Sequence, residues 1–195
     1  MNIITNRCLG GYIYRDILHE PYKNPFIWTG IHSDSFNYLF KNYRNINFKN
    51  VVLGFNENKF HTPYLLIEDK CKVNYDHVIF KEAANIPEII GNNIYIADTR
   101  KYTLDKYHER LKRMTEEPIF LYLDLDFTKN YKISAIAKEI KQRLGILTVD
   151  KDFEKNEFTD VRYIVHQDWK TVSWWDYLQE HHTQDIMDLI NIQRA

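Results

Sequence analysis

The chain has 195 residues, of which 44% are hydrophobic and 27% charged, and its formal net charge is −1. This composition is too hydrophobic for a disordered chain, and its even charge balance argues against a nucleic-acid binder, which usually carries a basic excess. Two cysteines are too few for the disulfide framework of a secreted protein.

The ends and the middle of the chain carry no sign of targeting or of a second domain. The N-terminal residues lack the charged start and apolar segment of a signal peptide, and no stretch approaches the ~18 consecutive apolar residues of a membrane span. We therefore expect a cytoplasmic protein. No repeat, low-complexity segment or flexible linker interrupts the sequence, which predicts a single domain over residues 1–195.

The first half of the chain begins with a short apolar segment and then becomes rich in strand-like segments. A buried strand is predicted over 2–5, followed by a Gly-Gly turn and an amphipathic run over 12–19. Ser33, Asp34 and Ser35 can cap a helix that continues through FNYLFKNY. The strand-like segments that come next cover 51–55, 64–68 and 73–80.

Strands and helices alternate in the second half. Strands are predicted over 93–98, 119–126 and 161–167, and helices over 103–114, 133–145 and 173–193. Such alternation implies parallel strands with helices on the faces of the sheet. The strands of the first half would add an antiparallel portion, so we predict one three-layer α/β domain with a central mixed sheet and flanking helices.

Cys8, in the segment NRCLGGYIYR, is the most suggestive candidate for chemistry. It lies between a predicted strand and a predicted helix, where the unpaired N–H groups of the helix lower a thiol pKa from about 8.5. Gly10 and Gly11 allow close approach of backbone or substrate, and amides from Leu9 to Gly11 could form an oxyanion hole. The alternative is a cysteine that only packs, since free cysteines are among the most buried residues.

A nucleophilic cysteine also needs a base. His77 lies in the strand-like segment VNYDHVIF and His166 ends the segment VRYIVH, so either can be proposed as the partner of Cys8. Asp76 would face the opposite side of the strand from His77. Asp98 or Asp124, each at a predicted strand end, is the better candidate for the residue that orients the base.

Asp124 and Asp126 support an alternative function. A D-x-D pattern at a strand end can hold Mg²⁺ or Mn²⁺ beside a sugar-nucleotide pyrophosphate, as in a small glycosyltransferase. Acidic residues at strand ends also cap helices or pair with cations. No other metal site is predicted, because the adjacent His181 and His182 would point about 100° apart on a helix. Since the usual nucleotide-binding motifs are absent, we expect no cofactor.

Aromatic residues are abundant, with 14 Tyr, 11 Phe and 4 Trp. Their rings either fill the core or form a surface that suits sugar rings. The second possibility predicts a non-catalytic module that binds a carbohydrate or a partner through an aromatic patch far from Cys8. The candidate contacts are Trp28, Trp169, Trp174 and Trp175.

The segment NRCLGGYIYRDILHEPYKNPFIW resembles the start of a bacterial domain family of unknown function, found alone or within glycosyltransferases and exopolysaccharide-biosynthesis proteins. The residues that fit its opening pattern are Asn6, Cys8, Gly10, Gly11, Tyr14, Tyr22, Asn24 and Pro25. Further matching positions are His77, Glu82, Ala83, Tyr107, Arg110 and Arg113. The family is itself similar to proteins classed as papain-like cysteine peptidases, which share a Pro-Phe-x-Trp segment, here ending at Trp28. The resemblance covers roughly residues 1–126.

The resemblance implies a cysteine-dependent acyl hydrolase or acyl transferase of surface-polysaccharide biosynthesis, acting on a saccharide or another small acyl-bearing substrate. Cys8 would be the nucleophile and His77 the base, with Asp98 or Asp124 orienting the imidazole. The residues expected to contact the substrate or the oxyanion are Gly10, Gly11, Tyr14 and Trp28.

Overall fold

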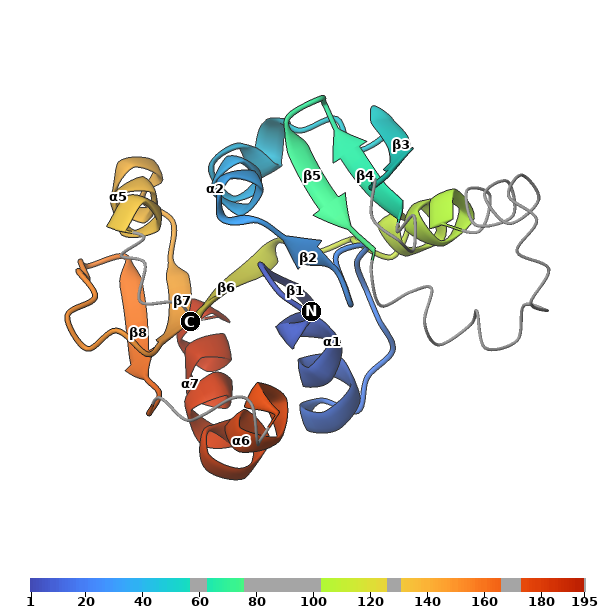
Figure 1. Cartoon of the computed structure of the whole chain (residues 1–195). Helices are drawn as coiled ribbons and strands as arrows, with labels where there is room; N and C mark the ends of the chain where they lie inside the picture. The colour runs from blue at the N-terminus through green and yellow to red at the C-terminus, as the bar shows by residue number, and fades with distance from the viewer. Residues whose placement is uncertain (57–62, 76–102, 126–130, 166–172, 195) are drawn as a thin grey trace.

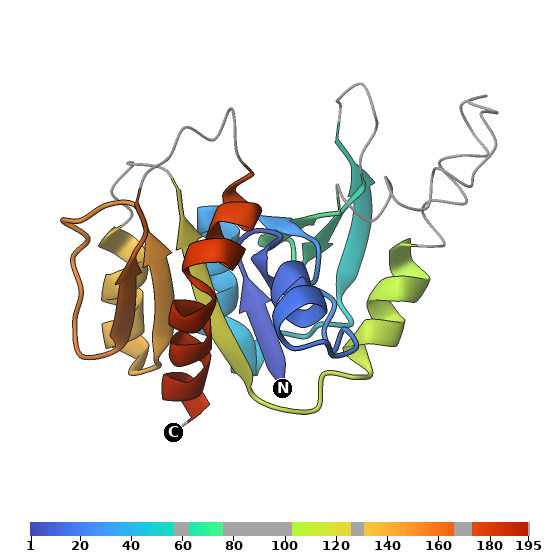
Figure 2. The ribbon, with the colours of Figure 1, turned by 90° about the horizontal axis from the view of Figure 1, so that it is seen from below.

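The computed structural model describes residues 1–56, 63–75, 103–125, 131–165 and 173–194 (Figure 1). Within them, a parallel sheet has the strand order β1-β6-β7-β8. Its strands are β1 (Asn2–Thr5), β6 (Pro118–Asp124), β7 (Leu144–Thr148) and β8 (Thr159–Tyr163). Every residue of β1, β6 and β7 is buried, as expected for parallel strands covered on both faces. The carboxyl ends of the strands therefore share one edge, and both chain ends lie at the opposite edge (Figure 2).

Helices pack against both faces of the parallel sheet (Figure 1). One face carries α2 (Ser33–Asn42) and α5 (Tyr131–Ile140). The other carries α1 (Leu9–Tyr12), the π-helical turn η1 (Ile13–Ile17), α6 (Trp174–His181) and α7 (Thr183–Arg194). Alternating residues of β6 separate the two cores, because Phe120 and Tyr122 pack with α2 whereas Leu121 and Leu123 pack with α7.

A second, antiparallel sheet has the order β2-β5-β4-β3. Its strands are β2 (Gly30–Ile31), β3 (Val51–Phe55), β4 (Pro63–Ile67) and β5 (Cys71–Asn74). The Ile31 amide donates a hydrogen bond of 2.9 Å to the Asn6 carbonyl, which ties β2 to the carboxyl end of β1. The 3-10 turn η2 (Tyr43–Asn45) comes after α2, and a further helix covers 103–111.

The predicted α/β class is confirmed, but the single mixed sheet is wrong. The antiparallel strands pair among themselves and form a sheet of their own, so the predicted three-layer arrangement is not confirmed. The predicted strand over 93–98 lies outside the described residues. None of the helices in the described ranges has both the length and the apolar character needed to cross a bilayer.

Two helix boundaries also differ from the prediction. The helix predicted to end at Gly145 ends at Ile140, where Lys141 takes the left-handed conformation, with φ 53°. Gly145 instead lies within β7, where a β-carbon would come within 2.5 Å of Leu121 Cδ2. The predicted helix over 173–193 is divided at His182, whose φ of −131° departs from helical geometry.

Candidate functional site

Cys8 lies at the carboxyl end of β1 and is the N-cap residue of α1. Its side chain is partly exposed. The helix continues without a break into the π-helical turn η1, a feature that often occurs at functional sites. The strand–cysteine–helix arrangement predicted from the sequence is therefore present.

Buried polar side chains hold the turn that carries Cys8. The Asn6 side chain donates to the Leu123 carbonyl at 3.0 Å and accepts from the Leu123 amide at 2.8 Å, which replaces a strand-to-strand pair. The Thr5 hydroxyl donates to the Arg7 carbonyl and accepts from the Gly10 amide at 3.0 Å. These bonds fix the backbone on both sides of Cys8.

The glycine amides do not form the predicted oxyanion hole. The Gly10 amide donates to the Thr5 hydroxyl, and the Gly11 amide donates to the Cys8 carbonyl at 3.0 Å. Both donors are thus used within the protein. The Leu9 amide, at the first position of α1, has no such bond in the described part of the chain and is the remaining donor of the predicted set.

Gly11 and Trp28 are in close contact. A β-carbon on Gly11 would lie 2.3 Å from Trp28 Cδ2, so the absence of a side chain lets the indole ring pack onto the helix. Trp28 itself has a φ of 60°, the left-handed region that bulky residues rarely adopt. In the structure, Gly11 leaves the space that the Trp28 ring occupies.

Tyr14, predicted to contact substrate, occupies a structural position instead. Its side chain is fully buried, and its hydroxyl donates to the Met1 carbonyl and accepts from the Ile3 amide. Burial raises the pKa of Tyr14 to about 12. The residue anchors η1 to β1.

Aromatic side chains from both ends of the chain gather one helical turn after Cys8. We call Tyr12, Trp28, Trp174 and Trp175 the aromatic cluster. The Tyr12 ring stacks on Trp175 at 4.4 Å between centroids and contacts the edges of Trp28 at 4.7 Å and Trp174 at 5.5 Å. All of these except Trp175 are partly exposed.

Tyr12 connects this cluster to the thiol. Burial raises the pKa of Tyr12, and negative charge on the nearby Cys8 raises it further. The Arg15 guanidinium lies 5.1 Å from the centroids of both the Tyr12 and Trp28 rings. The sulfur, a phenol and a cation therefore share one neighbourhood, which the sequence predicted only for Cys8 and Trp28.

A polar cavity of about 350 Å³ begins at the residues directly before Cys8. Its lining residues are Asn6, Arg7, Gly30, Ile31, His32, Ser33 and Asn74. His32 is exposed and is the N-cap residue of α2, which begins at Ser33 rather than after the predicted capping serines. Sequence reasoning did not select His32, because it becomes a candidate only through the Ile31–Asn6 bond that brings β2 to this edge.

Asp124 ends β6 and is buried at the same edge of the sheet. It accepts a hydrogen bond of 3.0 Å from the Thr148 hydroxyl, which in turn accepts from the Asp150 amide. Among the described residues, no group of three or more His, Cys, Asp or Glu side chains could hold a metal ion. The predicted D-x-D site also needs Asp126, which lies outside those residues.

Other predicted site residues also lie outside the described ranges. These are His77, Asp98, His166 and Trp169. The pairing of Cys8 with His77 or His166, and the choice of Asp98 or Asp124 as the orienting residue, therefore stay predictions.

The chain matches no model of a known protein family and no curated protein sequence. The resemblance to the exopolysaccharide-associated family accordingly stays a prediction, and a functional assignment rests mainly on the geometry around Cys8.

Proposed function

We propose that the protein is a cysteine-dependent acyl hydrolase or acyl transferase with Cys8 as its nucleophile. The observation that carries the proposal is the position of Cys8. It is partly exposed at the carboxyl edge of a parallel sheet, where α/β proteins place their ligands, and it immediately precedes a helix. The bonds of Asn6 and Thr5 hold this turn in place.

In the proposed reaction, the base takes the proton of the Cys8 thiol, and the thiolate attacks the carbonyl carbon of an ester and forms a tetrahedral intermediate. The carbon–oxygen bond to the leaving alcohol then breaks, the alcohol takes a proton from the conjugate acid of the base, and a thioester remains on Cys8. Water or the hydroxyl of a second substrate attacks the thioester, loses its proton to the base and restores the thiol. The Leu9 amide supports the oxyanion in this scheme.

The proposed base is a histidine. His77 is the candidate that the family resemblance implies, and His32 is a second candidate because it lines the cavity that includes Arg7. The two assignments make different predictions. His77→Asn abolishes turnover if His77 is the base, whereas His32→Asn does so if His32 acts instead.

The proposed substrate is a saccharide that carries an acyl group. The partly exposed rings of the aromatic cluster support this class, because sugar rings offer apolar faces beside hydroxyl groups. The cluster lies one helical turn from Cys8, which favours a combined site over a binding module remote from the thiol. A place in surface-polysaccharide biosynthesis rests on the family resemblance. We propose a cytoplasmic location because neither Cys8 nor Cys71 forms a disulfide.

The test uses the full chain with p-nitrophenyl acetate and O-acetylated oligosaccharides, with an intact-mass measurement after rapid acid quench. The proposal predicts an acetyl adduct on Cys8 and release of product. Cys8→Ser removes both while the melting temperature stays within about 2 °C, because a partly exposed serine is well tolerated. The matched control is Cys71→Ala, which retains the adduct. An adduct on another residue, or unchanged turnover in Cys8→Ser, would overturn the proposal.

A further inference from the structure

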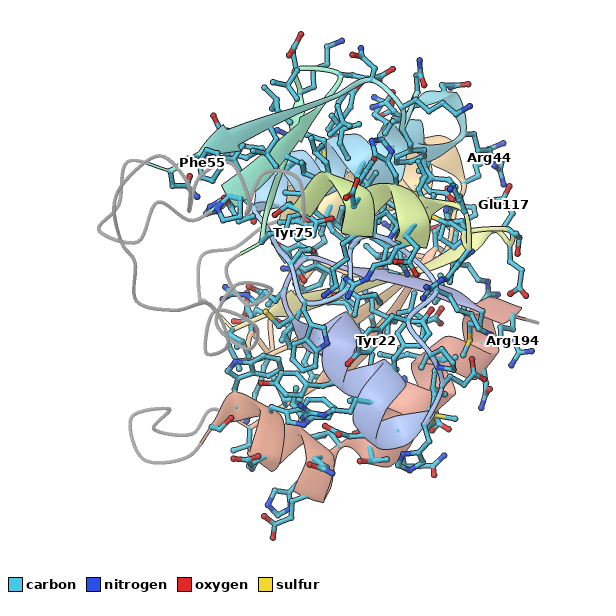
Figure 3. All side chains as sticks on the ribbon, turned by 90° about the vertical axis from the view of Figure 1, so that its right-hand side faces the viewer. Tyr22, Arg44, Phe55, Tyr75, Glu117 and Arg194 are labelled. Atoms are coloured by element: carbon cyan, nitrogen blue, oxygen red, sulfur yellow. The ribbon has the colours of Figure 1, made fainter. Side chains whose placement is uncertain are left out.

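A second cavity, of about 510 Å³, lies beside η1 and the segment that follows it. Its lining residues are Tyr14, Arg15, His19, Glu20, Pro21, Tyr22 and Arg113. Figure 3 shows Tyr22 between the α1–η1 helix and the helix over 103–111. The volume falls within the range of about 300–1,000 Å³ that is typical of small-molecule sites.

Charged side chains of both signs line this cavity. Arg15 and Arg113 contribute two guanidinium groups, and Glu20 is the only carboxylate among the lining residues. Lys23 lies 2.9 Å from Glu20 and lowers the pKa of that carboxyl, so the negative charge of Glu20 is already balanced. Asp16 pairs with Arg15 in the same way, and Glu109 pairs with Arg113. An anion entering the cavity therefore meets the N–H donors that the arginines retain rather than a net positive charge.

Both arginines are held in place and still have donors to spare. The Nε and Nη2 atoms of Arg15 donate to the Asp16 carboxylate at 2.6 and 2.7 Å. Arg113 bonds to Glu109 through Nη2 and to the Tyr22 carbonyl through Nη1 at 3.4 Å. A guanidinium carries five N–H groups, so each side chain retains donors beyond these bonds.

The backbone beside the arginines is constrained as well. His19 has a φ of 51°, a conformation that costs a non-glycine residue free energy and that recurs at binding sites. Its Nδ1 atom lies 3.0 Å from the Arg15 carbonyl and must carry the proton, because a carbonyl only accepts. At the end of η1, the Glu20 amide donates a hydrogen bond of 3.0 Å to the Tyr14 carbonyl. These bonds hold the backbone of this part of the cavity in place.

We propose that this cavity binds a small organic phosphate. Two guanidinium groups with free N–H donors match the oxygens of a phosphate, and their planar forks suit it better than a point charge does. Tyr22 and Pro21 supply apolar surface for the organic part, and Arg110 lies 5.3 Å from the Tyr22 ring centroid and steadies it. A sugar phosphate and a nucleotide share this chemistry. The proposal is independent of the reaction assigned to Cys8.

The experiment is isothermal titration of the full chain with glucose 1-phosphate, UMP and inorganic phosphate, with glucose and uridine as phosphate-free controls. We expect saturable binding of an organic phosphate and none of the two controls. Tighter binding of glucose 1-phosphate assigns a sugar phosphate, and tighter binding of UMP assigns a nucleotide. Absence of saturable binding, or binding of inorganic phosphate as tight as that of both organic phosphates, would overturn the proposal.

Variants place the binding in the cavity. Arg15→Gln and Arg113→Gln should each weaken binding about tenfold or more, as expected for loss of a charged hydrogen bond. Arg113→Lys keeps the charge, removes the fork and should fall between wild type and Arg113→Gln. The matched control is Arg44→Gln, because Arg44 is an exposed arginine beside Glu117 and lies away from Tyr22 (Figure 3). Cys8→Ser should bind like wild type. Equal affinity of the Arg15 and Arg113 variants and wild type would place the ligand elsewhere.

Discussion

Trp28 lies so close to Gly11 that its indole ring occupies the space where any other residue would place a side chain. The contact joins the segment after η1 to the first turn of α1, directly after Cys8. It also sets the position of Trp28 against Tyr12, and through Tyr12 against Trp175. The aromatic cluster therefore depends on one residue without a side chain.

Gly11→Ala should lower the free energy of unfolding by about 1–3 kcal/mol, because the indole must shift to admit a methyl group. Urea denaturation followed by tryptophan fluorescence measures the loss. Gly10→Ala is the matched control and should cost less, since its β-carbon would lie 3.2 Å from the Thr5 hydroxyl oxygen. In a Trp28→Ala background, Gly11→Ala should lose most of its effect. Additive effects of the two substitutions would show that their contact does not carry the cost.

The two cysteines should differ sharply in reactivity. Cys71 is fully buried in β5, and burial raises its pKa to about 12, so at pH 8 it is an enclosed neutral thiol. Cys8 is partly exposed. Iodoacetamide under native conditions should modify Cys8 alone, and both cysteines should react in 6 M guanidinium chloride. Peptide mass mapping distinguishes the two. Native modification of Cys71 would contradict the buried position assigned to it.

Much of the site was predictable because it is local in sequence. The short apolar segment before Cys8 indicates a strand and the amphipathic run after it indicates a helix, and the structure has both. The predicted Gly-Gly turn is wrong, because Gly10 and Gly11 lie within α1. The continuous apolar run that forms β6 likewise predicts a strand covered on both faces, because only such a strand needs no polar residues.

The features that the sequence did not reveal depend on contacts between residues far apart in the chain, or on a glycine that can be interpreted in more than one way. Tyr12 and Trp175 stack although more than 160 positions separate them, and no local pattern encodes that contact. Gly145 has the pattern of a helix end, yet Lys141 ends the helix and Gly145 makes room for Leu121. The strands of the first half pair with one another, and periodicity alone does not say which sheet a strand joins.

Asn37 is a place where substitution should stabilise the fold. It lies in α2 with 5% of its surface exposed, and neither its amide nitrogen nor its amide oxygen has a hydrogen-bond partner among the described residues. Asn37→Leu should raise the free energy of unfolding by about 1 kcal/mol, because it removes buried polar groups that are unsatisfied. Urea denaturation measures the change.

The matched control is Asn24→Leu. Asn24 is also buried, but its amide donates to the Ile3 carbonyl and accepts from the Phe26 amide, each at 2.9 Å. Its replacement should cost about 2–4 kcal/mol, because two backbone groups lose their partner. Equal destabilisation by Asn37→Leu and Asn24→Leu would mean that the Asn37 amide is bonded in solution.

Stability should fall in alkaline solution, in part because of Tyr14. Its folded-state pKa of about 12 lies above the value of about 10 for an unfolded chain, so the native state holds the proton more tightly. The stabilisation is complete below pH 10 and is lost as the pH rises through 12, with a loss of about 1 kcal/mol at pH 11. Denaturation at pH 9 and pH 11 measures it, and Tyr14→Phe should show a smaller decrease. Identical decreases in both proteins would assign the effect to other groups, such as Tyr43, whose pKa burial also raises to about 12.

Asn6 links the stability of the fold to the geometry of the site. Asn6 lies two positions before Cys8, and its side chain takes the place of a strand residue opposite Leu123. The side-chain nitrogen bonds to the Leu123 carbonyl and the side-chain oxygen to the Leu123 amide. Asn6→Ala should cost about 2–4 kcal/mol because the Leu123 amide and carbonyl lose their partners in a buried place. It should also change the rate at which iodoacetamide modifies Cys8.

The substitution Asn6→Asp distinguishes the bond to the Leu123 carbonyl from the bond to the Leu123 amide, because only the first depends on the protonation state of the new side chain. The ionised carboxylate still accepts from the Leu123 amide but cannot donate to the Leu123 carbonyl, whereas the protonated acid does both. Burial beside a carbonyl raises the pKa of the new aspartate above its unfolded value of about 3.9. The group then stabilises the protein at low pH, and this contribution is lost as the pH rises through the folded-state pKa. The deficit of Asn6→Asp relative to wild type should therefore be smaller at pH 5 than at pH 8. A deficit that is the same at both values would mean that the donor bond to the Leu123 carbonyl contributes nothing to holding the turn.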